Sequence, residues 1–282
     1  MRIGLCAGFG EDALGAEALG VIRSLGREGI RRDCPSDDKV NAGVLVQEIK
    51  DAGLFGLCLI GCGQHVVEQP AVLGRRGGMI ASLIRDTGLD GAIEVANEPD
   101  ESDVYRGRPD LLAAAINAVY ALACGVPVVI GGMCRMTRAN VDILARVCEL
   151  VPPDVIAAVH TYRDENGNPH TPRAGFASRT AEFRAIQAAV GARRLWCTEV
   201  GFHNGQPSSS WLDGILGKKR KRMSEEESCS NLREEHRLLD AEGFEWVFDF
   251  QHHDGPGENE RWGILRADGS LKPSAYITQE AV

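Results

Sequence analysis

Two glutamates each close a run of mainly apolar residues, a position from which a carboxylate can do chemistry. Glu98 ends "AIEVANE" (92–98) and is followed by Pro99, which lacks the amide hydrogen needed to extend a strand. Glu199 ends "RLWCTE" (194–199). Either glutamate alone is as readily an exposed carboxylate at a strand end. Together, across one pocket, two carboxylates can divide the roles of acid and nucleophile.

The elements that must position these glutamates alternate between strand-like and helix-like segments. We expect strands at 2–7, 29–34, 56–61, 91–96, 127–131, 155–160, 194–199 and 245–250. Such alternation predicts a parallel sheet with crossover helices, and eight is the strand number of a TIM barrel. We therefore predict the α/β class, as a (β/α)8 TIM barrel that forms a single catalytic domain over residues 1–282.

Amphipathic helical segments separate the expected strands, because apolar residues recur in them at helical spacing. We expect helices at 12–26, 38–52, 71–86, 109–123, 138–150, 179–190 and 225–241, with an eighth that is short or absent after residue 271. Four glycines stand just before expected strands, where we expect helices to end in a left-handed residue: Gly29, Gly56, Gly91 and Gly125.

The chemistry of a TIM barrel lies at the carboxyl ends of its strands. Glu98 ends the fourth expected strand and Glu199 the seventh, so closing the barrel would aim both carboxylates at one pocket. The longest connections also follow strands and would surround that pocket, at 161–177, 201–223 and 251–270.

Four segments resemble the clan A glycoside hydrolases, retaining (β/α)8-barrel enzymes, and most of all their cellulase-like and β-xylosidase-like members. These segments are "EVANEP" (94–99), "VHTY" (159–162), "CTEVGF" (197–202) and "WGILRADGSLKPSAY" (262–276), and the resemblance covers nearly the whole chain in order. It implies hydrolysis of β-glycosidic bonds by double displacement. The implied substrate is an oligosaccharide, a polysaccharide or a small glycoside, and the reaction needs no cofactor and no metal.

The resemblance also implies roles for particular residues. Glu98 would be the acid/base, Glu199 the nucleophile, and Asn97 a hydrogen-bond donor to the sugar 2-hydroxyl. Arg31 would keep the nucleophile charged and oriented, although it is about as readily a structural partner of Glu94 inside the barrel.

Further residues of the implied site come from the sixth and eighth strands. His160 and Tyr162 match the sixth-strand His-x-Tyr of related enzymes, in which an imidazole or an aromatic hydroxyl contacts the substrate or the nucleophile. A single histidine at a strand end is more often structural, but the two-residue spacing places both side chains on one face. The eighth strand departs from the commonest pattern, because Trp246 stands too early to form the sugar platform. Four later residues are candidates to replace it: Phe250, Gln251, His252 and Trp262.

Composition limits the partners and the compartment. The net charge of -9 argues against nucleic acid, and no apolar run is long enough to span a membrane. The nine cysteines are an odd number without a CxxC pair, so we expect reduced thiols. With no signal peptide at the N-terminus, these features indicate a cytoplasmic protein, or a secreted one if a leader was removed. The aromatic content of 6% favours a short sugar cleft.

Two other functions stay open at this point. A metal-dependent barrel hydrolase could use histidines that follow expected strands, namely His65, His160, His203, His252 and His253. The first strand lacks the His-x-His of such enzymes, and the chain has no HExxH motif. The second is a carbohydrate-binding pseudoenzyme, since a fold alone does not establish turnover.

Overall fold

The protein forms a ring of eight parallel strands. The computed structural model describes residues 1–7, 15–34, 37–61, 69–162, 168–173, 175–204, 223–254 and 262–277. The strands are β1 (Arg2–Cys6), β2 (Gly29–Asp33), β3 (Phe55–Ile60), β4 (Gly91–Val95), β5 (Val128–Ile130), β6 (Ala157–His160), β7 (Leu195–Val200) and β8 (Trp246–Asp249). Each lies within a residue or two of a predicted strand.

The sheet is a nearly closed barrel. Its hydrogen-bonded order is β5-β4-β3-β2-β1-β8-β7-β6, and the two end strands meet through a parallel bridge between Val129 and Ile156. The Ile130 amide donates to the Ile156 carbonyl at 2.9 Å across this seam. The predicted α/β class and (β/α)8 barrel are therefore confirmed.

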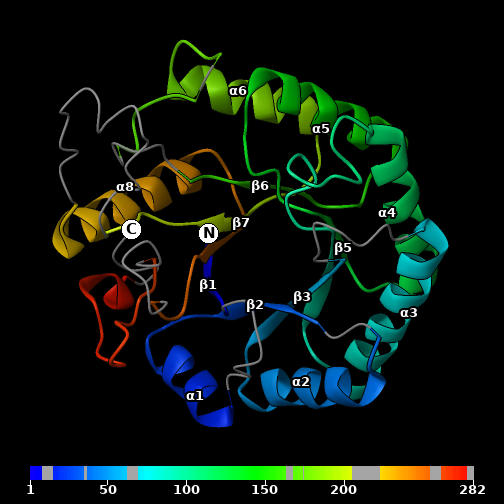
Figure 1. Cartoon of the computed structure of the whole chain (residues 1–282), viewed down its shortest axis with the longest axis horizontal. Coiled ribbons are helices and arrows are strands. Elements are labelled where there is room, and N and C mark those ends of the chain that lie inside the picture. The colour runs from blue at the N-terminus through cyan, green and yellow to red at the C-terminus, as the bar shows by residue number, and fades with distance from the viewer. Residues whose placement is uncertain are drawn as a thin grey trace.

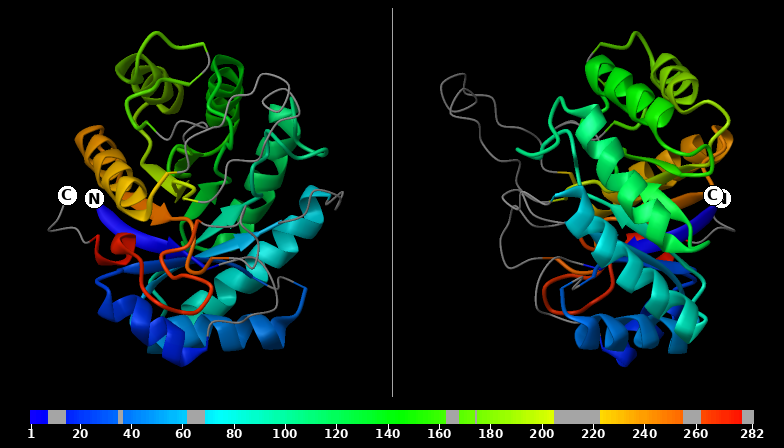
Figure 2. Two further views of the ribbon diagram at one scale, coloured as in Figure 1. Left: turned by 60° about the vertical axis from the view of Figure 1, so that its left-hand side comes forward. Right: turned by 90° about the vertical axis from the view of Figure 1, so that its right-hand side faces the viewer.

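Helices surround the strands in chain order (Figures 1 and 2). They are α1 (Ala16–Ser24), α2 (Lys39–Asp51), α3 (Pro70–Thr87), α4 (Pro109–Ala123), α5 (Arg138–Leu150), α6 (Arg179–Val190) and α8 (Glu225–Ala241). A short 3-10 helix, η1 (Pro273–Tyr276), lies between α8 and α1 (Figure 1), where the prediction has a short or absent eighth helix. Arg27, just after α1, donates to the carbonyls of Ser274 and Ile277 and holds this segment in place.

Polar side chains begin several helices by accepting hydrogen bonds from free backbone amides. Asp38 accepts from Val40 and Asn41 at the start of α2. At the start of α8, Ser224 and Glu227 form a capping box, in which each side chain accepts from the other residue's amide. These caps explain why the periodic segments begin where they do.

Aromatic rings fill the amino-terminal end of the barrel. Trp246 stacks on Phe248 at 5.2 Å between ring centroids and lies 4.6 Å from Phe55, and Trp196 packs beside them. Trp246 therefore belongs to the core, as its early position in the strand indicates. The opposite end of the barrel, where the strands finish, is left to carry the site.

The prediction for three of the four glycines is wrong. Left-handed backbone occurs three residues earlier, at Gly26, Gly53 and Gly88, and only Gly125 fits, with φ 89°. The predicted glycines instead stand at the start of strands and permit close packing. A Cβ at Gly29 would lie 2.8 Å from the Trp246 ring, and one at Gly91 would lie 2.7 Å from the Gly56 carbonyl.

Within the described part of the chain, no helix combines the length and the apolar character needed to cross a bilayer. The eight cysteines described there have free thiols. Cys62 and His65 lie outside the described residues, as do parts of the three long connections.

Candidate active site

The two predicted carboxylates meet at the carboxyl ends of the strands. One oxygen of Glu98, one oxygen of Glu199 and a ring nitrogen of His160 all lie within 4.8 Å of one another. Glu199 is 2% exposed, in β7, whereas the Glu98 side chain is 27% exposed, past the end of β4. Glu199 is thus buried, and Glu98 is partly exposed.

The backbone around Glu98 makes an unusual turn. Ala96 and Glu98 both have positive φ, 66° and 44°, a conformation that costs non-glycine residues of order 1–3 kcal/mol each. Two amides stabilise the turn by donating to the Glu98 carbonyl, from Glu101 at 2.8 Å and Ser102 at 3.1 Å. The strain therefore lies at the residue that carries the candidate acid.

Asp100 ties this turn to the connection after β5. Its carboxylate is buried and accepts three hydrogen bonds of 2.8 Å, from the Cys134 and Arg135 amides and the Asn140 side chain. Sequence reasoning missed this residue. No local pattern points to it, because its partners lie 34 to 40 positions further along the chain.

Arg31 links three of the site's polar residues. Its guanidinium, 2% exposed, donates to Glu199 Oε1 at 2.6 Å, to Asn97 Oδ1 at 2.8 Å and to Glu94. Burial lowers the pKa of Arg31, but the charges of Glu94 and Glu199 outweigh burial and raise it well above its usual value. Arg31 thus pairs with Glu94 and also contacts Glu199.

The contact with Arg31 fixes the orientation of Asn97. A guanidinium can only donate, so the amide oxygen of Asn97 must face it. The amide nitrogen then points the other way and can donate to a ligand hydroxyl, because Asn97 is partly exposed.

Tyr162 supplies the second donor to Glu199. Its hydroxyl donates to Glu199 Oε2, while Arg31 donates to Oε1. Burial and the charge of Glu199 raise the pKa of Tyr162 well above its usual value, so the phenol keeps its proton. The two donors, one on each oxygen, fix the direction of the Glu199 carboxylate.

His160 faces both carboxylates with one nitrogen. Its Nδ1 lies 3.2 Å from Glu98 Oε1 and 3.6 Å from Glu199 Oε2, and the ring is fully buried. The ring fits only because residue 132 is glycine, since a Cβ there would lie 2.2 Å from His160 Cδ2.

The surroundings of Glu98 favour its ionised form. Burial raises the pKa of Glu98, but the hydrogen bond and charge of His160, a hydrogen bond from Cys134 and the charge of Arg31 outweigh burial and leave the pKa below its usual value. Cys134 is a second residue that sequence reasoning missed.

Among the candidates for the sugar platform, Trp262 and Phe250 gather around Tyr162. The Trp262 ring lies 5.3 Å from Tyr162 and 5.1 Å from His203, and Phe250 lies 5.7 Å from Tyr162. His252 is a poorer candidate because it is only 9% exposed, and burial lowers its pKa to about 4. The structure thus brings all seven predicted site residues to one end of the barrel.

Glu98, His160 and Glu199 are also the one group among the described residues that could hold a metal ion. Of the expected histidines that the structure describes, namely His160, His203, His252 and His253, only His160 belongs to it. Both oxygens of Glu199 already accept hydrogen bonds, from Arg31 and Tyr162, so an ion would have to displace a donor or share its oxygen.

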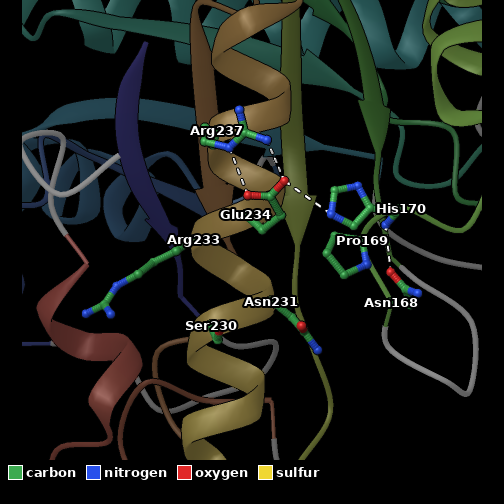
Figure 3. A pocket seen from close by; sticks show the side chains of 8 residues that line it. All are labelled: Asn168, Pro169, His170, Ser230, Asn231, Arg233, Glu234 and Arg237. Carbon is green, nitrogen blue, oxygen red and sulfur yellow. Dashed lines mark hydrogen bonds and ion pairs between the residues drawn. The ribbon is translucent and has the colours of Figure 1, made fainter.

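A separate hollow of about 490 Å³ lies between residues 168–170 and α8 (Figure 3). In Figure 3, Glu234 stands between Arg237 and His170, and its carboxylate pairs with both. The residues that line it include no phenylalanine, tyrosine or tryptophan and neither candidate carboxylate. It therefore lacks the large aromatic faces on which sugar rings usually stack.

No family profile matches the sequence, and no curated protein matches it either. Solved structures do match. A family 39 glycoside hydrolase from Bacteroides cellulosilyticus WH2 has a TM-score of 0.68 at 16% identity, over 97% of this chain and 61% of that one. A GH5-4 broad specificity endoglucanase from Clostridum cellulovorans has a TM-score of 0.69 at 12% identity, over 100% of this chain and 93% of that one. This chain has the (β/α)8 fold of these glycoside hydrolases.

A third match is an active-site mutant of the β-1,3-glucanosyltransferase of Rhizomucor miehei in complex with laminaritriose. Its TM-score is 0.66 at 13% identity, over 97% of this chain and 96% of that one. At such identities the likeness is one of fold.

Proposed function

We propose that the protein is a retaining glycoside hydrolase that cleaves β-glycosidic bonds by double displacement. The observation that carries the proposal is the separation of the two carboxylates, whose nearest candidate oxygens lie within 4.8 Å. Retaining enzymes hold their carboxyl groups about 5–5.5 Å apart, whereas inverting enzymes leave roughly 6.5–9.5 Å for a water molecule. The short separation supports direct attack by one carboxylate.

In the first step, Glu199 attacks the anomeric carbon while Glu98 gives its proton to the departing glycosidic oxygen. The products are a glycosyl ester on Glu199 and the free alcohol. In the second step, Glu98 takes a proton from water, whose oxygen displaces Glu199 and releases the sugar. The enclosed position of Glu199 and the more open position of Glu98 suit this assignment.

The remaining residues of the site support these two. Arg31 and Tyr162 would hold Glu199 aimed at the anomeric carbon, since each donates to one of its oxygens. Asn97 would donate its amide hydrogen to the sugar 2-hydroxyl, the direction left open by its contact with Arg31. His160 would keep the two carboxylates in place, and Trp262 would lie against the sugar.

The substrate class we propose is a β-linked oligosaccharide, polysaccharide or small glycoside. The structurally similar proteins support it, since they include an endoglucanase and a glucanosyltransferase in complex with laminaritriose. A net charge of -9 is unsuited to polyanionic nucleic acid.

The test is a screen of aryl β-glycosides and β-glucans with the wild type, Glu98→Gln, Glu199→Gln and a control, Glu149→Gln, whose carboxylate is 67% exposed on α5. We expect activity in the wild type and the control, loss in both site variants, and a product that keeps the anomeric configuration, as followed by proton NMR. An inverted product would refute double displacement. Binding without turnover on every substrate would instead favour a carbohydrate-binding pseudoenzyme.

One observation favours a second function, a metal-dependent hydrolase, because Glu98, His160 and Glu199 can supply ligands to one ion. Arg31 argues against it, since its charge lies at the same carboxylate that would bind the cation. Elemental analysis of the purified protein, together with assays before and after chelation, decides between the two. A stoichiometric metal whose removal abolishes turnover would support the metal-dependent reaction.

A further inference from the structure

The C-terminal segment 262–277 carries a buried lysine that the proposed reaction does not use. The Lys272 side chain is 1% exposed, and its ammonium donates to Asp254 Oδ1 at 2.6 Å and to Asn204 Oδ1 at 3.3 Å. Burying a charge is costly unless it is paired and hydrogen-bonded. Lys272 therefore holds together the segments that follow β7 and β8.

The same carboxylate oxygen also holds the backbone beside Trp262. Asp254 Oδ1 accepts from the Gly263 amide at 2.8 Å, and the next amide, of Ile264, donates to the Gln251 carbonyl at 2.9 Å. The packing at Gly263 is close, since a Cβ there would lie 2.3 Å from the Asp254 nitrogen. On its C-terminal side, Trp262 is thus anchored to the segment after β8.

This anchor connects Lys272 to the candidate active site. The Trp262 ring lies 5.3 Å from the ring of Tyr162, whose hydroxyl donates to Glu199. The Lys272 amide donates to the Ile264 carbonyl at 2.9 Å, so its backbone and its side chain hold the same short segment. A shift of Lys272 would move the indole relative to Tyr162.

We propose that Lys272 is a positioning residue for Trp262: through Asp254 it fixes the position of the indole ring relative to Tyr162 and Glu199. This rests on the proposed function, because it takes Trp262 as the ring against which the sugar lies. Binding sites need side chains held to within about 0.5 Å, and a ring that is already fixed loses less conformational freedom when ligand binds. Removing the ion pair should therefore weaken substrate binding more than it slows the chemical steps.

The test introduces Lys272→Met into the wild type and into Trp262→Ala, and compares its effect on KM and kcat in the two proteins. The substitution keeps the length of the side chain and removes the charge. We expect Lys272→Met to raise KM several-fold with a smaller change in kcat, and to add nothing in the Trp262→Ala background. An equal rise in both backgrounds would overturn the proposal. If Lys272→Met does not fold, Asp254→Asn weakens the same contact from the other side.

A matched control removes a buried ion pair outside the barrel. Arg179 donates to Glu182 and Glu235, each at 2.6 Å, between α6 and α8. Arg179→Met should lower the melting temperature as Lys272→Met does, yet leave KM unchanged. A KM that rises equally in both variants would show that Lys272 has only a general structural role.

A readout independent of turnover is fluorine NMR of the protein labelled with 5-fluorotryptophan. The chain has four tryptophans, and Trp262→Phe identifies the resonance of Trp262. Lys272→Met should shift or broaden that resonance, and Arg179→Met should not. An unchanged resonance in folded Lys272→Met would overturn the positioning role. A shifted resonance in a protein that hydrolyses no glycoside would keep the positioning role and reject the hydrolase.

Discussion

The Nδ1 atom of His160 lies 3.2 Å from Glu98 Oε1, so the candidate acid is hydrogen-bonded to an imidazole in the resting site. Burial raises the pKa of Glu98, but this contact, the charge of His160 and the smaller effects of Cys134 and Arg31 outweigh it and lower the pKa. A general acid must carry its proton when the substrate arrives. The contact with His160 therefore favours activity at acidic pH.

We predict that His160→Ala moves the basic limb of the pH profile of kcat/KM to higher pH. Activity that needs protonated Glu98 falls as pH rises through the pKa of Glu98, and removing His160 removes the largest influence that lowers that pKa. The measurement uses a substrate with a poor leaving group. His160→Asn, which keeps a donor near Nδ1 without a charge, should give a smaller shift. A limb that stays fixed or moves to lower pH in His160→Ala would contradict this account.

Arg31→Met should cost both stability and activity, and a second substitution should separate the two. The change leaves Glu94 and Glu199 buried without their cation, which lowers the free energy of unfolding by about 3–5 kcal/mol. Adding Glu94→Met removes one of the two orphaned charges and should recover part of the stability, but not the activity, because Glu199 keeps only the Tyr162 donor and still lacks that of Arg31. Urea unfolding and steady-state kinetics measure the two effects. Recovery of activity together with stability would mean that Arg31 acts only as a structural partner of Glu94.

Features that depend on the local sequence could be predicted. Alternating apolar runs and helical periodicity located the strands closely, and apolar runs ending in glutamates indicated Glu98 and Glu199. Asp100 and Lys272 gave no such signal, because their roles depend on partners such as Asn140 and Asp254 that only the folded chain brings near.

The errors at the glycines have the same origin. Gly29 is needed because the Trp246 ring, distant in sequence, packs against it, whereas a left-handed residue ends a local helix three positions earlier. A single sequence shows that a glycine precedes a strand. It does not show whether the backbone angle or a close neighbour requires it.

Asp249 should make the fold sensitive to acid. Its oxygens lie 2.7 Å from His236 Nε2 and 2.8 Å from the Arg27 guanidinium. Burial raises the pKa of Asp249, but the charges of His236 and Arg27 and the hydrogen bond from His236 outweigh burial and lower it. Its stabilisation is therefore fully present above the unfolded pKa of about 3.8 and is lost as pH falls through the lower folded pKa.

Asp249→Asn should then lower the free energy of unfolding by about 3–5 kcal/mol at neutral pH, because it leaves Arg27 buried without its counter-charge. The difference in unfolding free energy between this variant and the wild type should shrink as the pH falls to about 3, below the unfolded pKa of an aspartate. Urea unfolding at several pH values measures it, with the exposed Asp86→Asn as control. A difference that is constant with pH would show that ionisation of Asp249 is not the cause.

Asp100→Ala should impair catalysis by Glu98 without touching the pocket. The carboxylate of Asp100 accepts three hydrogen bonds that tie the turn carrying Glu98 to the connection after β5. Without them, the left-handed conformation of Glu98 loses support, and its carboxyl group is less often aimed at the departing oxygen. General acid catalysis contributes roughly 10²–10⁴-fold, so a partial loss of aim should slow substrates with poor leaving groups about 10-fold or more.

An activated aryl glycoside, whose leaving group needs no proton, should react in the first step nearly as in the wild type. Asp100→Asn keeps one acceptor oxygen, so its rate on substrates with poor leaving groups should lie between those of the wild type and Asp100→Ala. Equal loss on both kinds of substrate would show that Asp100 maintains the whole site and not the aim of Glu98.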